Sequence, residues 1–205
     1  RPGEWVLDRL EPDSRFTFIH CTQMEPHETK SLARSGAIAG LCPITESSLG
    51  DGIFDGVRWF ENGGRIAIGS DSNIRIALSE ELRTLEYSQR LRDRSRAALA
   101  SPAQSTGRRL FEAVATGGAA AAGRPTGAIG VGQLADLLTL DGSHVDLEVR
   151  NGDTILDAFA FAGDDRMVRE VWSAGRHLVR SGRHIARDAI VADYRKVSKD
   201  LGGAI

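Results

Sequence analysis

Two residues that can carry acid–base or metal chemistry follow predicted strands. His20 ends the aromatic and β-branched run 16–19, and Asp71 comes shortly after the apolar run 65–68. The carboxyl ends of the strands in a parallel α/β barrel share one rim, where the active site lies. We therefore expect His20 and Asp71 to approach a common point. There a carboxylate can bind a metal and take a proton from water, and a neutral imidazole can orient that water or polarise a substrate.

A third set of polar residues follows the predicted strand 37–41. Cys42 precedes a proline and has no local base, which argues against a thiolate nucleophile. Two interpretations of Glu46 stay open: its carboxylate closes the site, or it caps the polar loop predicted over 44–52. For His20 the alternative is a strand-end histidine with a backbone hydrogen bond. No catalytic role is expected for the histidines that do not end a barrel strand: His27, His144, His177 and His184.

The elements that must position these residues alternate between strand and helix. Strands are predicted over 16–20, 37–41 and 66–68. Helices are predicted at 4–10, 26–34, 54–61, 79–99 and 106–122. The helix over 79–99 is more polar than a core helix and is expected on the outside. The alternation of strand and helix predicts a parallel sheet.

The pattern changes from Gly123 onward, where short strands alternate with turns. The expected strands are 135–140, 145–149, 155–161, 168–172 and 177–180. Ser173–Arg176 is predicted to be a hairpin turn. The glycine-rich stretch 127–132 has no basic residue beside it, so a turn is expected there and not a phosphate-binding loop. An amphipathic helix is predicted over 189–201.

Composition limits the class of protein and its partners. The 205 residues are 41% hydrophobic and 26% charged, with a formal net charge of -2. This balance predicts a soluble globular protein that binds neither nucleic acid nor an anionic membrane. No apolar run approaches a membrane span of about 18 residues, and no signal-peptide pattern is present, so a cytoplasmic location is expected. Cys21 and Cys42 are expected to be packed thiols without a disulfide.

Several motifs resemble the late strands of the amidohydrolase superfamily. They lie at 18–23, which contains His20, at 41–52, and at 68–73, which contains Asp71. The Thr-Glu-x-x-Leu-Gly-Asp-Gly stretch and the Gly-Ser-Asp-Ser-Asn ending are more similar to the formimidoylglutamate deiminases than to guanine deaminases or chlorohydrolases. The stretch 127–141 resembles the β-sandwich segment that follows the barrel in the same superfamily.

The resemblance implies an α/β fold, the C-terminal part of a TIM (β/α)8 barrel (about strands 6 to 8) plus a segment of a small β-sandwich. The implied boundaries are 1–123 for the barrel part, 124–185 for the sandwich segment and 186–205 for a C-terminal helix. Asp71 matches the aspartate that binds zinc and shuttles the proton of water. His20 matches the histidine that helps to activate water and contacts the substrate imine. The implied reaction hydrolyses N-formimidoyl-L-glutamate to N-formyl-L-glutamate and ammonia in histidine degradation.

Other parts of the family's pattern have no counterpart here. No His-x-His pair occurs, and the fifth-strand histidine and its nearby glutamate are absent. One carboxylate does not complete a zinc site, which takes three protein ligands and water. We therefore expect one zinc ion whose remaining ligands come from an N-terminal half outside this sequence, and we expect the 205 residues alone to be inactive. The expected partners are that half, a small-molecule substrate and a second copy in a homodimer.

Two alternatives to the deiminase hypothesis stay open. One is another deaminase or chlorohydrolase of the superfamily, acting on a ring amidine or a halide. The other is a non-catalytic barrel remnant that serves as a metal-free binding module. Turnover of formiminoglutamate against guanine and related rings separates the first alternative from the deiminase, and zinc content with ammonia release separates the second.

Overall fold

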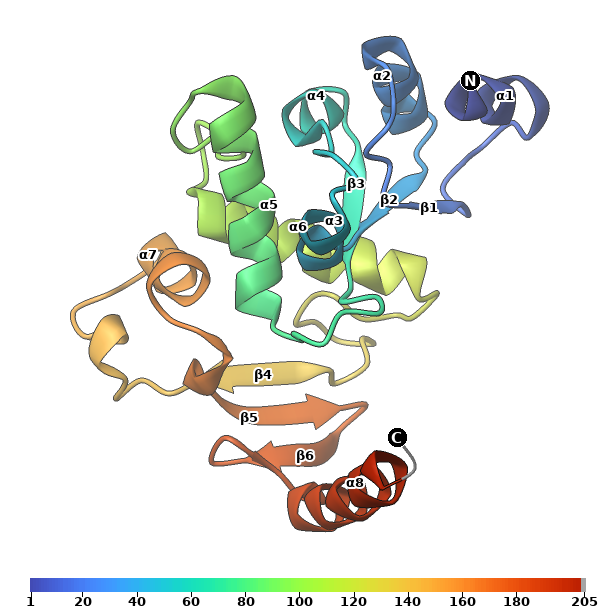
Figure 1. The fold of residues 1–205 in the computed structure, drawn as a ribbon. Coiled ribbons are helices and arrows are strands. Elements are labelled where there is room, and N and C mark those ends of the chain that lie inside the picture. Colours follow the sequence, from blue (N-terminus) through green and yellow to red (C-terminus); the bar gives the residue numbers. More distant parts are fainter. Residues whose placement is uncertain (204–205) are drawn as a thin grey trace.

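The computed structural model describes residues 1–203 and contains two sheets joined by helices (Figure 1). In chain order the elements are α1 (Pro2–Arg9), β1 (Thr17–Ile19), α2 (Pro26–Arg34), β2 (Ile38–Leu41), α3 (Pro43–Leu49), α4 (Gly56–Glu61), β3 (Arg65–Ile68), α5 (Leu78–Asp93), α6 (Thr106–Ala121), β4 (Leu137–Leu140), the 3₁₀ turn η1 (Val145–Leu147), α7 (Asp153–Asp157), the π-helical segment η2 (Ala158–Ala162), the 3₁₀ turn η3 (Asp165–Met167), β5 (Val168–Ser173), β6 (Arg176–Arg180), β7 (Arg183–His184) and α8 (Arg187–Gly202).

The first sheet is parallel, in the order β1-β2-β3, as the alternation of strands and helices predicts. All four residues of β2 are buried, and Ile66 in the middle of β3 is fully buried. Helix α6 packs directly on β3: a side chain at Gly117 would collide with the carbonyl oxygen of Ile66. Glycine is needed there because helix and strand backbones touch. Both β1 and β3 are thereby held in fixed positions relative to β2.

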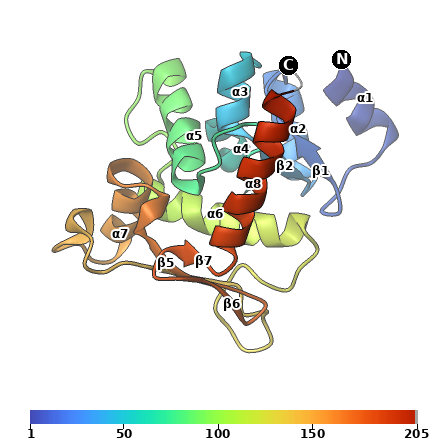
Figure 2. The same ribbon diagram turned by 60° about the horizontal axis from the view of Figure 1, so that its bottom comes forward.

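The second sheet is antiparallel, in the order β4-β5-β6-β7. The predicted strands at 135–140, 168–172 and 177–180 are confirmed as β4, β5 and β6. The predicted hairpin turn is also confirmed, with Ala174 at φ 48° and Gly175 at φ 78°. Two positive φ angles in succession are typical of the two-residue turns that match the twist of the strands. Helix α6 lies between this sheet and the parallel one (Figures 1 and 2).

Two strands predicted in this part of the chain are wrong. The stretch 145–149 contains η1, and 155–161 lies in α7 and η2. For 155–161 the reason is a pair of acids, Asp153 and Asp157, which a helix brings within about one turn of each other and a strand would hold roughly 13 Å apart. Their carboxylates accept hydrogen bonds from the Ser105 and Gly107 backbone N–H groups at the start of α6, at 3.2 and 2.7 Å. The apolar run alone does not distinguish a strand from a buried helix.

The predicted loop at 44–52 is also wrong, because it contains the helix α3. Pro43 has the fixed φ that suits the first position of a helix, and Gly50 ends the helix at φ 73°. The Ser47 hydroxyl donates to the carbonyl oxygen of Pro43 at 2.7 Å. The strand end at Cys42 therefore turns straight into a helix that lies over the rim of the parallel sheet.

Helix α5 is shorter and more buried than the sequence predicts. It ends at Asp93, and Arg94 follows in the left-handed region. Its inner face carries Leu82, Leu85 and three polar residues that are also buried, Glu81, Glu86 and Gln89. The polar groups bind backbone atoms of other segments, as Glu86 does when it accepts hydrogen bonds from the N–H groups of residues 98 and 99. The polar sequence therefore does not mark an outer helix.

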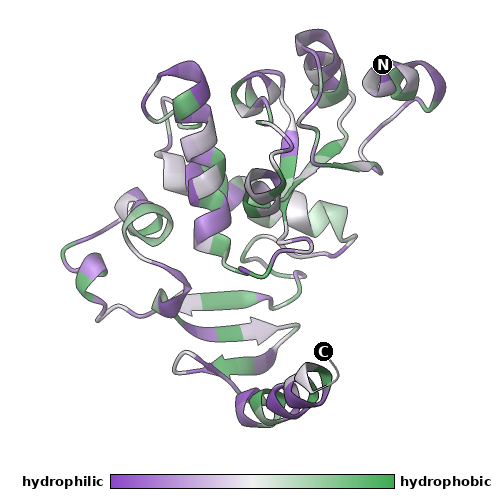
Figure 3. Ribbon diagram, viewed as in Figure 1, coloured by the Kyte–Doolittle hydropathy of each residue, from purple (hydrophilic) through white to green (hydrophobic). Residues whose placement is uncertain are grey.

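The predicted amphipathic helix at the end of the chain is confirmed as α8. None of its residues that the structure describes is buried, and hydrophobic and hydrophilic residues alternate around it (Figure 3). No helix within residues 1–203 combines the length and the apolar character that a membrane span requires.

Candidate active site

The structure brings together the two residues that the sequence singles out. His20 follows β1 and Asp71 follows β3, and the His20 Nε2 atom lies 3.6 Å from the Asp71 Oδ2 atom. Both backbones are in the left-handed region, with φ of 68° for His20 and 51° for Asp71. Such angles are costly for residues other than glycine and occur at functional sites. Both side chains are about one-third exposed, so they are accessible from the rim.

Glu46 supplies the second contact to His20, and it lies in the first turn of α3 instead of a loop. One carboxylate oxygen, Oε1, accepts a hydrogen bond from the Cys42 N–H at 2.8 Å and lies 3.2 Å from His20 Nδ1. An ionised carboxylate only accepts hydrogen bonds, so it selects the imidazole tautomer that carries its proton on Nδ1. This leaves the lone pair of Nε2 facing Asp71. Burial raises the pKa of Glu46, and the hydrogen bonds from Cys42 and His20 oppose that rise.

A contact that the sequence analysis missed holds Asp71. The Thr45 hydroxyl donates to the carbonyl oxygen of Ser70 at 2.8 Å, which ties α3 to the residue before Asp71. The Ser72 hydroxyl lies 3.3 Å from Asp71 Oδ1 and donates to it. The proline after Cys42 was the available signal for a helix here, and a helix would have placed Thr45 and Glu46 on the rim.

The two cysteines are free thiols, as predicted. Burial, together with the nearby carboxylates of Glu46, Asp71 and Glu81, raises the pKa of Cys42 to about 11. The pKa of Cys21 rises to about 12, also mainly through burial. Neither thiol is therefore an activated nucleophile.

The site residues have donor atoms that suit zinc. One ligand atom each from His20, Cys42 and Asp71 lies within 4.8 Å of the other two. Imidazole nitrogen, thiolate sulfur and carboxylate oxygen are the ligands that zinc takes in proteins. Because the surroundings of Cys42 favour its protonated form, the Asp71 carboxylate is the anionic donor of this group. The residues fit a zinc ion but do not complete its coordination, which takes three protein ligands in catalytic sites.

The other histidines lie in structural contacts away from this rim. His27 Nε2 lies 3.0 Å from a carboxylate oxygen of Glu4, and His177 pairs with Glu170 at 2.6 Å. His144 and His184 accept hydrogen bonds from nearby backbone N–H groups. Each of the four therefore has a contact that does not involve His20 or Asp71.

Comparison with known proteins gives the family. The sequence profile described as "Amidohydrolase family" matches residues 3–178. The chain belongs to this family. A formimidoylglutamate deiminase from Pseudomonas aeruginosa is 46% identical to it over 202 residues, which are 98% of this chain and 45% of the relative. The resemblance predicted from the motifs is thereby confirmed.

Solved amidohydrolase structures show the same fold. A crystal structure of an amidohydrolase from Brucella melitensis has a TM-score of 0.91 and 43% identity, with 98% of this chain and 44% of that chain covered. An adenosine deaminase from Xanthomonas campestris with bound zinc has a TM-score of 0.83 and 25% identity, with coverage of 96% and 45%. The α/β fold of the family is therefore shown, and the chain spans about half the length of the relatives it matches.

Proposed function

We propose that the protein carrying this chain is a zinc-dependent deiminase that hydrolyses N-formimidoyl-L-glutamate to N-formyl-L-glutamate and ammonia in histidine degradation. The observation that carries the proposal is the 3.6 Å approach of His20 Nε2 to Asp71 Oδ2, with Glu46 behind the imidazole. The similarity to a formimidoylglutamate deiminase over 98% of the chain supports this substrate. Acid–base groups that meet at the ends of parallel strands are what a hydrolase of this fold requires.

The proposed reaction gives each residue a task. Asp71 is a metal ligand and accepts a proton from the attacking water. Water oxygen bonds to the formimino carbon, and the bond from this carbon to the terminal nitrogen breaks. The protons of the water leave with that nitrogen as ammonia. Zinc, when bound, lowers the pKa of water and stabilises the charge that develops on the substrate.

The proposed task of His20 follows from its two nitrogen atoms. Glu46 holds the Nδ1 side, so Nε2 faces the reacting groups with a free lone pair. From there it can orient the attacking water, contact the imine, and take up a proton that came from the water and pass it to the departing nitrogen. A cavity of about 440 Å³ beside His20, lined in part by residues 19–24, gives the substrate room.

The rest of the proposal concerns the whole protein. We assign 1–123 to about strands 6 to 8 of a (β/α)8 barrel, 124–185 to a β-sandwich segment and 186–205 to a C-terminal helix, of which 204–205 lie outside the described residues. The parallel order β1-β2-β3 and the antiparallel sheet after it support this division. The remaining zinc ligands and the groups that bind the substrate carboxylates would come from polypeptide outside this chain, so the 205 residues alone would be inactive. A homodimer in the cytoplasm is part of the same proposal.

The test is turnover by the full-length protein. We expect about one zinc per subunit and ammonia release from N-formimidoyl-L-glutamate, with little or none from adenosine, guanine or a chlorotriazine. The zinc-containing adenosine deaminase among the similar structures makes adenosine the most informative competitor. Preference for a ring substrate would replace the deiminase by another enzyme of the family. Absence of both zinc and ammonia release would favour the metal-free binding module.

A further inference from the structure

Three consecutive residues at the start of α3 bind three different elements of the protein. The Ile44 N–H donates to Glu81 Oε2 in α5 at 2.9 Å. The Thr45 hydroxyl donates to the Ser70 carbonyl at the end of β3, and Glu46 contacts His20 at the end of β1. The first turn of α3 therefore decides how the groups at both strand ends are held.

Glu81 is buried, with only 2% of its surface exposed. Its Oε2 atom accepts the Ile44 N–H, and its Oε1 atom is buried without a hydrogen-bond partner among residues 1–203. Burial, helped by the charges of Glu46 and Glu80 and opposed by the hydrogen bond from Ile44, raises the pKa of Glu81 to about 7. A buried carboxyl group is costly, and an apolar side chain of the same size would avoid that cost. What Glu81 provides, and an apolar side chain would not, is an acceptor for the Ile44 N–H.

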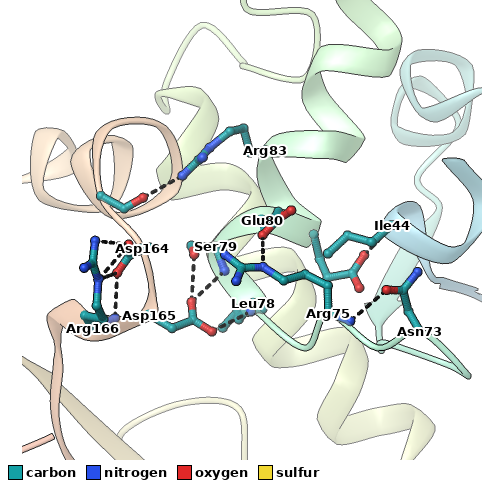
Figure 4. Close-up of polar contacts among 12 residues, drawn as sticks. Ile44, Asn73, Arg75, Leu78, Ser79, Glu80, Arg83, Asp164, Asp165 and Arg166 are labelled. Atoms are coloured by element: carbon teal, nitrogen blue, oxygen red, sulfur yellow. Dashed lines mark hydrogen bonds and ion pairs between the residues drawn. The ribbon is translucent and has the colours of Figure 1, made fainter. Parts of the chain in front are cut away.

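Helix α5 holds Glu81 in a fixed position. Asp165 accepts hydrogen bonds from the N–H groups of Leu78 and Ser79, at 2.9 and 3.0 Å, and from the Ser79 hydroxyl at 2.7 Å (Figure 4). One turn further on, the Arg83 guanidinium donates to the carbonyl oxygens of Ala160 and Gly163. The start of α5 is thus anchored on both sides of Glu81.

Helix α3 depends on such an outside partner because it has only seven residues. The first N–H groups of a helix have no partner within it. Pro43 has no N–H, Glu46 accepts that of Cys42, and Glu81 accepts that of Ile44. Without this acceptor the first turn can move, and Thr45 and Glu46 would move with it.

We propose that Glu81 is a positioning residue of the active site, which acts by accepting the Ile44 N–H. It holds the first turn of α3 where Glu46 orients His20 and where Thr45 fixes the backbone next to Asp71. Glu81 does not touch the reacting groups, and its effect on catalysis rests on the proposed deiminase function. Its effect on α3 and on the His20 imidazole does not depend on the deiminase function.

The test uses three variants of the full-length protein. Glu81→Gln keeps an oxygen acceptor, and Glu81→Met keeps the length of the side chain without an acceptor. Glu86→Met is the matched control, since Glu86 is fully buried on the same helix and accepts backbone N–H groups of residues 98 and 99, which belong to no part of the site. Three quantities are measured: hydrogen exchange in α3, the ring-nitrogen resonances of His20 in the metal-free protein, and kcat and KM.

We expect Glu81→Gln to keep the protection of α3 and a kcat within about threefold of the wild type. In Glu81→Met, exchange at Ile44 rises and kcat falls about tenfold with little change in KM, as expected for loss of one hydrogen bond that orders the site. The His20 resonances shift toward a mixture of tautomers. Glu86→Met speeds exchange at residues 98 and 99 and leaves His20 and kcat unchanged.

Three results would overturn the proposal. One is faster exchange at Ile44 in Glu81→Met with an unchanged His20 resonance and kcat. Another is loss of kcat in Glu81→Gln while α3 stays protected, which also decides the matter if Glu81→Met does not fold. The third is an equal effect of Glu86→Met on His20. A wild type without deiminase activity would defeat the proposed function, and the exchange and resonance measurements would still test Glu81.

Discussion

The two sheets of this chain differ in how firmly they hold their side chains. Every residue of β2 is buried, and the middle of β3 is buried too. None of the described residues in β4 to β7 is buried, and a cavity of about 550 Å³ lies between β4, β5 and α6. The candidate catalytic residues all belong to the first sheet. His20 and Asp71 follow β1 and β3, the two strands that pair with the fully buried β2, so a well-packed strand separates and supports the segments that carry them.

The largest expected effect comes from the firmly held region. Asp71→Asn in the full-length protein should lower kcat by more than about 1,000-fold, because it removes a charged metal ligand and a proton acceptor together. Zinc content should fall as well. Asp93→Asn, at the far end of α5, serves as the control and should leave both unchanged. An Asp71→Asn enzyme with a tenth of the wild-type rate would show that the site lies elsewhere.

His20→Ala separates catalysis from metal binding at the same rim. We expect kcat to fall about 100-fold or more, since general acid–base groups typically contribute that much. Most of the zinc should stay bound, because Asp71 and ligands from the rest of the protein hold it. Metal analysis of the purified variant checks this. Loss of zinc in parallel with activity would make His20 a ligand.

Two neighbouring glycines test the packing of the first sheet directly. Gly117→Ala should destabilise the protein by about 2–3 kcal/mol, because the new methyl group meets the backbone of Ile66 and overpacks the contact. Gly118 has open space around it, so Gly118→Ala should stabilise α6 by about 0.5–1 kcal/mol. Denaturant unfolding measures both. Equal effects would mean that α6 does not touch β3 as described.

The smallest expected effect concerns pH. The pKa of Glu81 is raised to about 7 in the folded protein, from about 4.5, so its neutral form is favoured by folding. The stability that neutral Glu81 contributes is fully present below its pKa in the unfolded chain. It is lost as the pH rises through the pKa of Glu81 in the folded protein. Between pH 5 and 6 the wild type should lose stability relative to Glu81→Gln, on the order of 1 kcal/mol. Unfolding of the metal-free proteins by urea at both pH values measures this. The same dependence of unfolding free energy on pH in the wild type and in Glu81→Gln would contradict this prediction.

The sequence predicts the strands of the parallel sheet better than the segments around the antiparallel sheet. The strands that became β1, β2 and β3 are short apolar runs bounded by glycine, proline or polar residues, so both their extent and the residues at their ends were predictable. The approach of His20 to Asp71 followed from the rule that parallel strands share a rim. That rule needs no knowledge of distant contacts.

Two of the errors involve hydrogen bonds between segments far apart in the chain. Helix α3 takes its acceptor from Glu81 of α5, 37 residues further on. Helix α7 forms because Asp153 and Asp157 face the start of α6. Local patterns do not contain these partners, so 44–52 was predicted as a loop and 155–161 as a strand. For the same reason the contacts of Thr45 with Ser70 and of Glu46 with His20 were not predicted.

The most direct test of this account is the position of the metal in crystals of the full-length protein, located by anomalous diffraction at the zinc edge. We predict a zinc ion about 2.0–2.2 Å from a carboxylate oxygen of Asp71. His20 should lie beside it, with Nδ1 on Glu46 and Nε2 facing the ion's open position. A zinc ion bound away from Asp71, or none in an enzyme that still releases ammonia from N-formimidoyl-L-glutamate, would contradict the account.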